Sequence, residues 1–212
     1  MGTVALQEHA PDPALAAAAG VIGPNALIQV AAALKDSHGP AEAAAVFARA
    51  GLSRFLDQPP ETMVDERFVT ALHATLRARL GVAEARAVAD DAGVRTAGYL
   101  LAHRIPSAAQ RVLGVLPPVL AARMLMGSIG AHAWTFAGGG AFTYRADRPV
   151  VFSVEGCPLC RDAHAAPGAV LCDYYAGTFR HLFRTLVTPR ARVAQTACQA
   201  AGAAACTFTI TW

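Results

Sequence analysis

Hydrophobic positions recur with a helical period over most of the first two thirds of the chain. In residues 60–81, apolar side chains fall near one face, acidic residues come early, arginines come late, and Gly81 ends the pattern. The apolar positions are Met63, Val64, Phe68, Leu72, Leu76 and Leu80. Pro40 and Gly51 bracket another helix, because proline suits the first helical position and glycine the end. Further helices are predicted over 82–103, 108–116 and 118–132.

The pattern changes after His132 to short aromatic or β-branched runs. Segments 133–136, 142–145 and 149–156 predict strands, residues 170–186 predict a helix, and 190–198 and 206–212 predict two more strands. The last segment alternates strictly, which is typical of a half-buried antiparallel strand. One face carries Cys206, Phe208, Ile210 and Trp212, and the other carries three threonines. The sequence therefore predicts an α+β fold that closes with a hairpin.

The predicted organisation is one compact unit in three parts. Residues 1–23 form a loose lead-in, residues 24–132 a helical part, and residues 133–212 a strand-rich core. The chain of 212 residues is 54% hydrophobic and 16% charged, as expected for a globular domain. The longest uncharged run, 124–144, is broken by glycines and His132, so we expect a buried helix and turn and no membrane span.

Charge and targeting signals narrow the function further. A net charge of +3 is spread along the chain without a basic block, which argues against nucleic-acid binding. The start of the chain has no basic region followed by an apolar core and a cleavage site, so a cytoplasmic location is expected.

All five cysteines lie between residues 157 and 206. Cys157 and Cys160 form a C-x2-C knuckle, Cys172 precedes a predicted helix, and Cys198 and Cys206 flank the last hairpin. Because clustered cysteines in a reducing compartment more often bind metal than form disulfides, we expect a structural zinc site. An iron–sulfur cluster is the alternative cofactor, and buried cysteines without metal are the plainer one. A tetrahedral ion leaves at least one of the five without a place.

The segments "CDYYAGTF" and "CQAAGAAACTFTI" resemble the V4R (4-vinyl reductase) domain family. The segments "MVDERFVTALHATLRARLG", "AGYLLAHRIP", "HAWTFAGGGAF" and "CPLCR" resemble the members that take part in bacteriochlorophyll biosynthesis. The resemblance implies a fold related to haem-dependent nitric-oxide-binding domains, and Cys172, Cys198 and Cys206 as zinc ligands. Sensor members have a carboxylate where this chain has Gln195. A neutral amide is a poor zinc ligand, so Cys157 or Cys160 is expected in the fourth position.

The resemblance, together with an apolar and aromatic group near the change from helices to strands, implies a ligand-binding role. We expect an accessory protein that binds a Mg-tetrapyrrole intermediate similar to divinyl protochlorophyllide and delivers it to a bacteriochlorophyll-biosynthesis enzyme. The candidate ligand-binding residues are Tyr99, His103, Arg104, His132, Trp134 and Phe136. The alternatives are a 4-vinyl reductase and a small-molecule sensor module. The sensor members of the family imply a homodimer.

Overall fold

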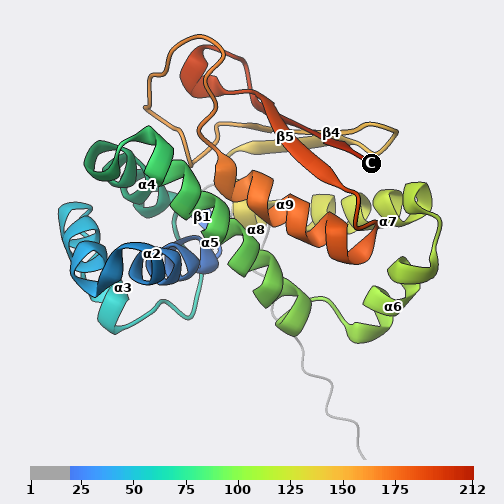
Figure 1. The fold of residues 1–212 in the computed structure, drawn as a ribbon, viewed down its shortest axis with the longest axis horizontal. Helices are drawn as coiled ribbons and strands as arrows, with labels where there is room; N and C mark the ends of the chain where they lie inside the picture. Colours follow the sequence, from blue (N-terminus) through green and yellow to red (C-terminus); the bar gives the residue numbers. More distant parts are fainter. Residues whose placement is uncertain (1–19) are drawn as a thin grey trace, which may run out of the picture.

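The strand-rich end of the chain forms one antiparallel sheet in the order β3-β4-β6-β5 (Figure 1). The computed structural model describes residues 20–212. The strands of this sheet are β3 (Ala141–Arg145), β4 (Val150–Glu155), β5 (Arg192–Ala197) and β6 (Cys206–Thr211). Two further short strands, β1 (Val21–Ile22) and β2 (Val64–Asp65), pair with each other. The α+β prediction is confirmed.

Helices make up the rest of the fold and lie on one side of this sheet (Figure 1). Their bounds are α2 (Asn25–Arg49), α3 (Arg54–Asp57), α4 (Glu66–Leu80), α5 (Val82–His103), α6 (Ser107–Val115), α7 (Pro118–Ala131), α8 (Trp134–Ala137) and α9 (Asp173–Leu186), with a 3-10 turn, η1, at Gln199–Ala201. Within residues 20–212, none of them has both the length and the apolar character that crossing a membrane requires.

Most predicted helices and strands are confirmed, with four differences in detail. The helix predicted over 60–81 begins only at Glu66, because Val64–Asp65 pair with β1 as strand β2. The helix expected after Pro40 is the second half of α2, which bends at Gly39, where φ is 85°. Residues 133–136, predicted as a strand, form the helical turn α8, because the Tyr175 hydroxyl donates to Phe136 O and Gly23 N donates to Thr135 O. The helix expected from residue 170 begins at Asp173.

The three-part division of the chain stays a prediction. Of the predicted lead-in, residues 1–19 lie outside the described residues, and Val21–Ile22 form β1. One continuous set of buried side chains runs from the helical part into the sheet. Phe179 of α9 stacks on Phe152 of β4 with ring centroids 3.9 Å apart, and Phe152 stacks on Phe208 of β6 at 4.6 Å.

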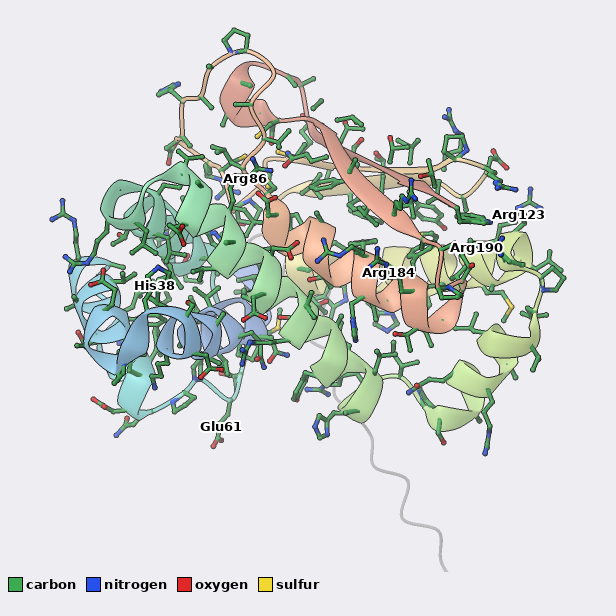
Figure 2. The ribbon with its side chains drawn as sticks, viewed as in Figure 1. His38, Glu61, Arg86, Arg123, Arg184 and Arg190 are labelled. Atoms are coloured by element: carbon green, nitrogen blue, oxygen red, sulfur yellow. The ribbon has the colours of Figure 1, made fainter. Side chains whose placement is uncertain are left out.

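Helices α5 and α9 approach each other unusually closely, and two glycines permit this. A Cβ on Gly93 would lie 2.1 Å from the Tyr174 carbonyl oxygen, and one on Gly177 would lie 2.4 Å from the Asp90 carbonyl oxygen. Ion pairs join the same two helices: Arg86 to Asp173 at 2.8 Å, and Arg180 to Asp90 at 2.7 Å (Figure 2 labels Arg86). The start of α9, which carries the cysteine site described below, is therefore fixed against α5.

Replacing Gly93 with alanine tests this close approach. We expect Gly93→Ala to lower the free energy of unfolding by at least about 2 kcal/mol, because the contact is with backbone atoms that cannot rotate away. Gly98→Ala on the same helix is the matched control, since a Cβ there meets nothing within 4 Å. It should raise stability by about 0.5–1 kcal/mol. Equal effects of the two substitutions in urea unfolding would contradict the interpretation.

Candidate metal centre

Four buried cysteines lie close enough together to bind one metal ion. The Sγ atoms of Cys157, Cys160, Cys172 and Cys206 all lie within 4.8 Å of one another. Individual Sγ–Sγ distances are 3.6 Å for Cys157–Cys172, 3.3 Å for Cys160–Cys206 and 3.6 Å for Cys172–Cys206. A tetrahedral zinc ion with Zn–S bonds of about 2.3 Å separates its sulfurs by about 3.8 Å. The spacing of the four thiols therefore fits a single ion.

Cys198 lies beside this group as a fifth thiol. Its Sγ is 4.0 Å from that of Cys206, as expected for the two ends of the predicted hairpin. However, Cys198 is outside the set in which every sulfur is near every other. The resemblance implied Cys198 as a ligand, whereas the geometry favours Cys157 and Cys160 together with Cys172 and Cys206.

Side-chain amides hold the backbone of two ligand-bearing segments. Gln195 Oε1 accepts a hydrogen bond from Cys172 N at 2.9 Å, and Gln199 Oε1 accepts one from Cys157 N at 2.9 Å. The Gln195 amide also donates to Ala197 O. Gln195 thus positions the N-cap residue of α9 from the neighbouring strand β5, and this explains an amide at the place where sensor members have a carboxylate.

The thiols are strongly coupled to one another. Hydrogen bonds from the surrounding thiols, that of Cys157 first, hold the pKa of the Cys160 thiol well below its ordinary value. The same network, again with Cys157 first, raises the pKa of Cys172 and of Cys206. The thiols therefore do not ionise alike, because the pKa is lowered for Cys160 and for the neighbouring Cys198 and raised for Cys172 and Cys206. A bound cation would lower the pKa of every thiol that ligates it.

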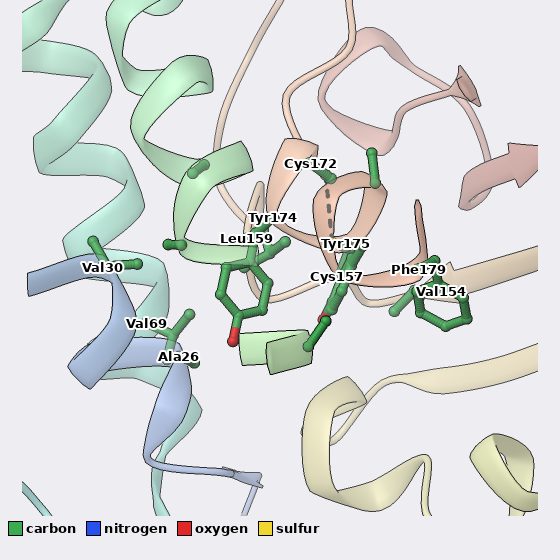
Figure 3. Close-up of a cluster of buried hydrophobic side chains, with 14 of the residues drawn as sticks. Ala26, Val30, Val69, Val154, Cys157, Leu159, Cys172, Tyr174, Tyr175 and Phe179 are labelled. Atoms are coloured by element: carbon green, nitrogen blue, oxygen red, sulfur yellow. Dashed lines mark hydrogen bonds between the residues drawn. The ribbon is translucent and has the colours of Figure 1, made fainter. Parts of the chain in front are cut away.

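Helix α4 supports the C-x2-C knuckle from the side (Figure 3 shows Cys157, Leu159 and Cys172 in this region). Thr70 Oγ1 donates to Pro158 O at 2.8 Å, and Arg77 Nη1 donates to Leu159 O at 2.9 Å. Burial lowers the pKa of Arg77, while the cysteines, Cys172 first, act to raise it. Arg77 thus supplies positive charge next to a site that becomes negative when its thiols ionise.

Glu66, at the start of α4, forms a second support. It is 7% exposed, and its carboxylate accepts hydrogen bonds from Gly139 N at 2.9 Å and from the Arg161 guanidinium. A Cβ on Gly138 would lie 2.0 Å from Glu66 Oε2, so the glycine run wraps closely around this carboxylate. Arg161 follows Cys160 directly, and therefore the ion pair ties the end of the knuckle to α4.

A groove adjoins the metal site, and we call it the α4 groove. It lies between one face of α4 and the loop 161–171, and its volume is about 1020 Å³. Its lining residues are Arg67, Thr70, Ala71, Ala74, Arg77, Ala78, Val82, Arg161, Asp162, Ala163, His164, Ala165, Ala166, Ala169 and Leu171. The groove could not be predicted from the sequence, because its two walls are far apart in the chain.

The ligand-binding residues predicted from the sequence lie in two groups. Tyr99 and His103 pack against each other on α5 with ring centroids 4.8 Å apart, and Arg104 follows at the end of that helix. His132 ends α7 in an exposed position, with Nδ1 2.8 Å from Ser128 O, and Trp134 begins α8. Phe136 belongs to the aromatic core, 5.2 Å from Phe142 and 6.1 Å from Tyr175 between ring centroids.

Metal content of single variants will distinguish the ligands from the spare thiol. We expect Cys160→Ser to lose bound zinc and to unfold at lower denaturant, because it removes one sulfur of the compact set. Cys198→Ser is the matched control and should keep about one zinc per chain, measured by elemental analysis of protein purified without added metal. Zinc loss in Cys198→Ser with full retention in Cys160→Ser would favour the ligand set implied by the resemblance.

His73 of α4 is a further buried group near this site. It is 2% exposed, and Nε2 has no hydrogen-bond partner among the described residues. Burial first, and then the nearby charge of Arg77, lower its pKa from 6.5 to about 3. As the pH falls, His73 is therefore protonated at a higher pH in the unfolded chain than in the folded protein. Its contribution to the free energy of unfolding is complete above pH 6.5 and is lost as the pH drops from 6.5 towards 3.

This pKa predicts a measurable acid sensitivity. Between pH 7.5 and 5.5 His73 should reduce the free energy of unfolding by about 1.4 kcal/mol. His73→Phe should lack this contribution, so the difference in unfolding free energy between the two proteins should change with pH by that amount. Zinc content is checked at each pH so that metal loss is not mistaken for protonation. Parallel pH profiles would contradict the pKa assignment.

Comparison with known proteins agrees with this architecture. The V4R domain family model matches residues 150–211, which run from β4 through the end of β6 and include all five cysteines. The chain is 40% identical over 187 residues to the bacteriochlorophyll synthase 23 kDa chain of Cereibacter sphaeroides, covering 88% of each protein. It is 36% identical over 189 residues to the protein of the same name from Rhodobacter capsulatus, covering 89% of this chain and 86% of that one. The chain therefore belongs to the V4R domain family, in the group of the bacteriochlorophyll synthase 23 kDa chains, and is involved in bacteriochlorophyll biosynthesis.

Proposed function

We propose that the protein is an accessory factor that binds a Mg-tetrapyrrole intermediate and delivers it to a bacteriochlorophyll-biosynthesis enzyme. The observation that carries this proposal is the identity of 40% over 88% of both chains with a protein named as a bacteriochlorophyll synthase chain. The name of that relative implies a role alongside bacteriochlorophyll-synthesis enzymes, which supports this proposal. Binding and delivery suit a chain whose cysteine cluster is buried and whose α4 groove lies beside it.

We further propose that the cluster holds a structural zinc ion. Four thiolates without an open position are typical of structural zinc. The sulfur spacing supports one ion, because an iron–sulfur cluster would place several atoms between the same sulfurs. When bound, zinc would join the knuckle, the start of α9 and the start of β6. A cytoplasmic homodimer remains our expectation for the assembled protein.

The position of the ligand predicted from the sequence stays a prediction. His132 is the candidate to coordinate Mg²⁺, with Trp134 and Phe136 nearby in the chain, and Tyr99, His103 and Arg104 as the other group. The interaction of His132 Nδ1 with Ser128 O leaves Nε2 as the nitrogen available to a metal.

Titration with Mg-protoporphyrin IX tests the proposed function. The full-length, zinc-loaded protein should shift the main absorption band and change the pigment's fluorescence, with saturation at one pigment per chain. Serum albumin at the same concentration controls for nonspecific partition of the pigment. Absence of any spectral change with folded protein would contradict the proposed function.

Reduction of a 4-vinyl group is the second candidate. It rests on the match to the V4R (4-vinyl reductase) domain family, since the sulfur spacing favours one ion over an iron–sulfur source of electrons. The reaction adds two electrons and two protons to the vinyl group to give an ethyl group. Purified protein is incubated with divinyl protochlorophyllide and a reduced viologen, and the products are separated by chromatography. Monovinyl product in amounts above a Cys160→Ser control would favour the enzyme over the carrier.

A further inference from the structure

We propose that the α4 groove is the tetrapyrrole-binding site, with Arg77 as the partner of a pigment carboxylate. This inference rests on the proposed function and gives it a location different from the one that the sequence suggests.

The walls of the groove suit a flat apolar ligand. Ala71, Ala74 and Ala78 follow one another at helical spacing on α4, so methyl groups form most of this wall, with Thr70 as its one hydroxyl. The opposite wall is also formed largely by alanines, namely Ala163, Ala165, Ala166 and Ala169. Short side chains on both walls leave a slot in which a planar macrocycle could contact methyl groups on both faces.

The charges of the groove suit an anionic ligand. Arg67, Arg77 and Arg161 line it against a single carboxylate, Asp162. Arg67 is paired with Asp65 and Arg161 with Glu66, whereas Arg77 donates a hydrogen bond to the backbone oxygen of Leu159. Arg77 therefore keeps guanidinium N–H groups for a carboxylate, and a half-buried arginine binds a carboxylate more strongly than an exposed one.

The position of Arg77 also links the groove to the metal centre. The loop that forms one wall joins Cys160 to Cys172, both members of the four-thiol set. Its middle is fixed to the terminal hairpin by the hydrogen bond from Ala165 N to Ala200 O at 2.8 Å. A metal ion bound by the four cysteines would hold both ends of this wall in place, so the groove depends on the metal without the pigment touching it.

The size and accessibility of the groove fit a carrier. Its volume of about 1020 Å³ is at the upper end of the usual range for small-molecule sites, as a tetrapyrrole requires. Ala74 and Ala78 are exposed to solvent, so one edge of a bound pigment would remain accessible to a receiving enzyme.

The test combines groove variants with Mg-protoporphyrin IX as the probe. Ala74→Trp should fill the slot and raise the Kd at least about 10-fold, because the indole occupies the space of the macrocycle. Ala44→Trp, at an exposed alanine of α2 outside the groove, is the matched control and should bind like the unchanged protein.

The pairing of Arg77 with a pigment carboxylate is tested by changing the side chain of residue 77 and by removing the carboxylates of the pigment. Arg77→Gln should raise the Kd about 10-fold, since a charge-assisted hydrogen bond is lost, and Arg77→Lys should recover part of the affinity. The dimethyl ester of the pigment has no carboxylates. It should bind the unchanged protein more weakly than the free acid does, and its Kd should be the same for the unchanged protein and for Arg77→Gln. Zinc content and thermal unfolding of each variant show whether the knuckle is intact, since Arg77 also bonds Leu159 O.

The outcomes separate this inference from the proposed function. In one outcome, Ala74→Trp and Arg77→Gln bind the pigment with unchanged affinity while His132→Ala loses affinity. That result would overturn the assignment of the α4 groove as the binding site and leave the proposed pigment binding in place. Unchanged pigment affinity in Ala74→Trp with weaker capture of a biosynthetic enzyme would show the groove to be a protein-docking surface and would also overturn the inference. No pigment binding by the unchanged protein would contradict the proposed function itself.

Discussion

The meeting of buried thiols from three separate segments is the constraint on which the strand-rich half of the molecule depends. The knuckle follows β4, Cys172 caps α9, and Cys206 begins β6, so one small volume joins the ends of two strands and a helix. Every sulfur in this volume is buried, and the thiols shift one another's pKa values in opposite directions. Without a cation, the arrangement gains only weak thiol hydrogen bonds. With one, it becomes a cross-link between segments that are distant in the chain.

Helix α4 transmits that constraint to the helical half. One face of the helix carries Thr70 and Arg77, which bond the carbonyl oxygens of the knuckle, and its first residue binds Arg161 just beyond it. The backbone carbonyls that α4 holds belong to Pro158 and Leu159, between the two knuckle cysteines. A shift of α4 would therefore move sulfur atoms, and loss of the metal would release the wall that faces α4. The metal centre and the groove thus behave as one structural unit.

The sequence predicted the fold more completely than the site. Periodicity located α5 to the residue, and the alternation in the last strand correctly placed Cys206, Phe208 and Ile210 in the core. It failed for residues 133–136, because four residues contain too little periodicity to separate a strand from a helical turn, and the deciding contacts come from Gly23 and Tyr175. The cysteine spacing predicted a shared site, but spacing alone could not rank Cys198 against Cys157. That ranking depends on how the hairpin and the knuckle meet in three dimensions.

The α4 groove could not be predicted from the sequence for a similar reason, because both of its walls consist largely of alanines. Alanines on a helix ordinarily indicate helix propensity, and alanines in a loop indicate nothing specific, so neither wall is distinctive alone. Facing each other, the two walls form the proposed binding surface. It would hold a flat pigment through contact with methyl groups and through the half-buried guanidinium of Arg77, without aromatic side chains that would enclose the ligand. Such a surface provides moderate affinity and leaves one edge of the ligand exposed. A carrier needs this combination, because a pigment held in a closed pocket would be released slowly to the next enzyme.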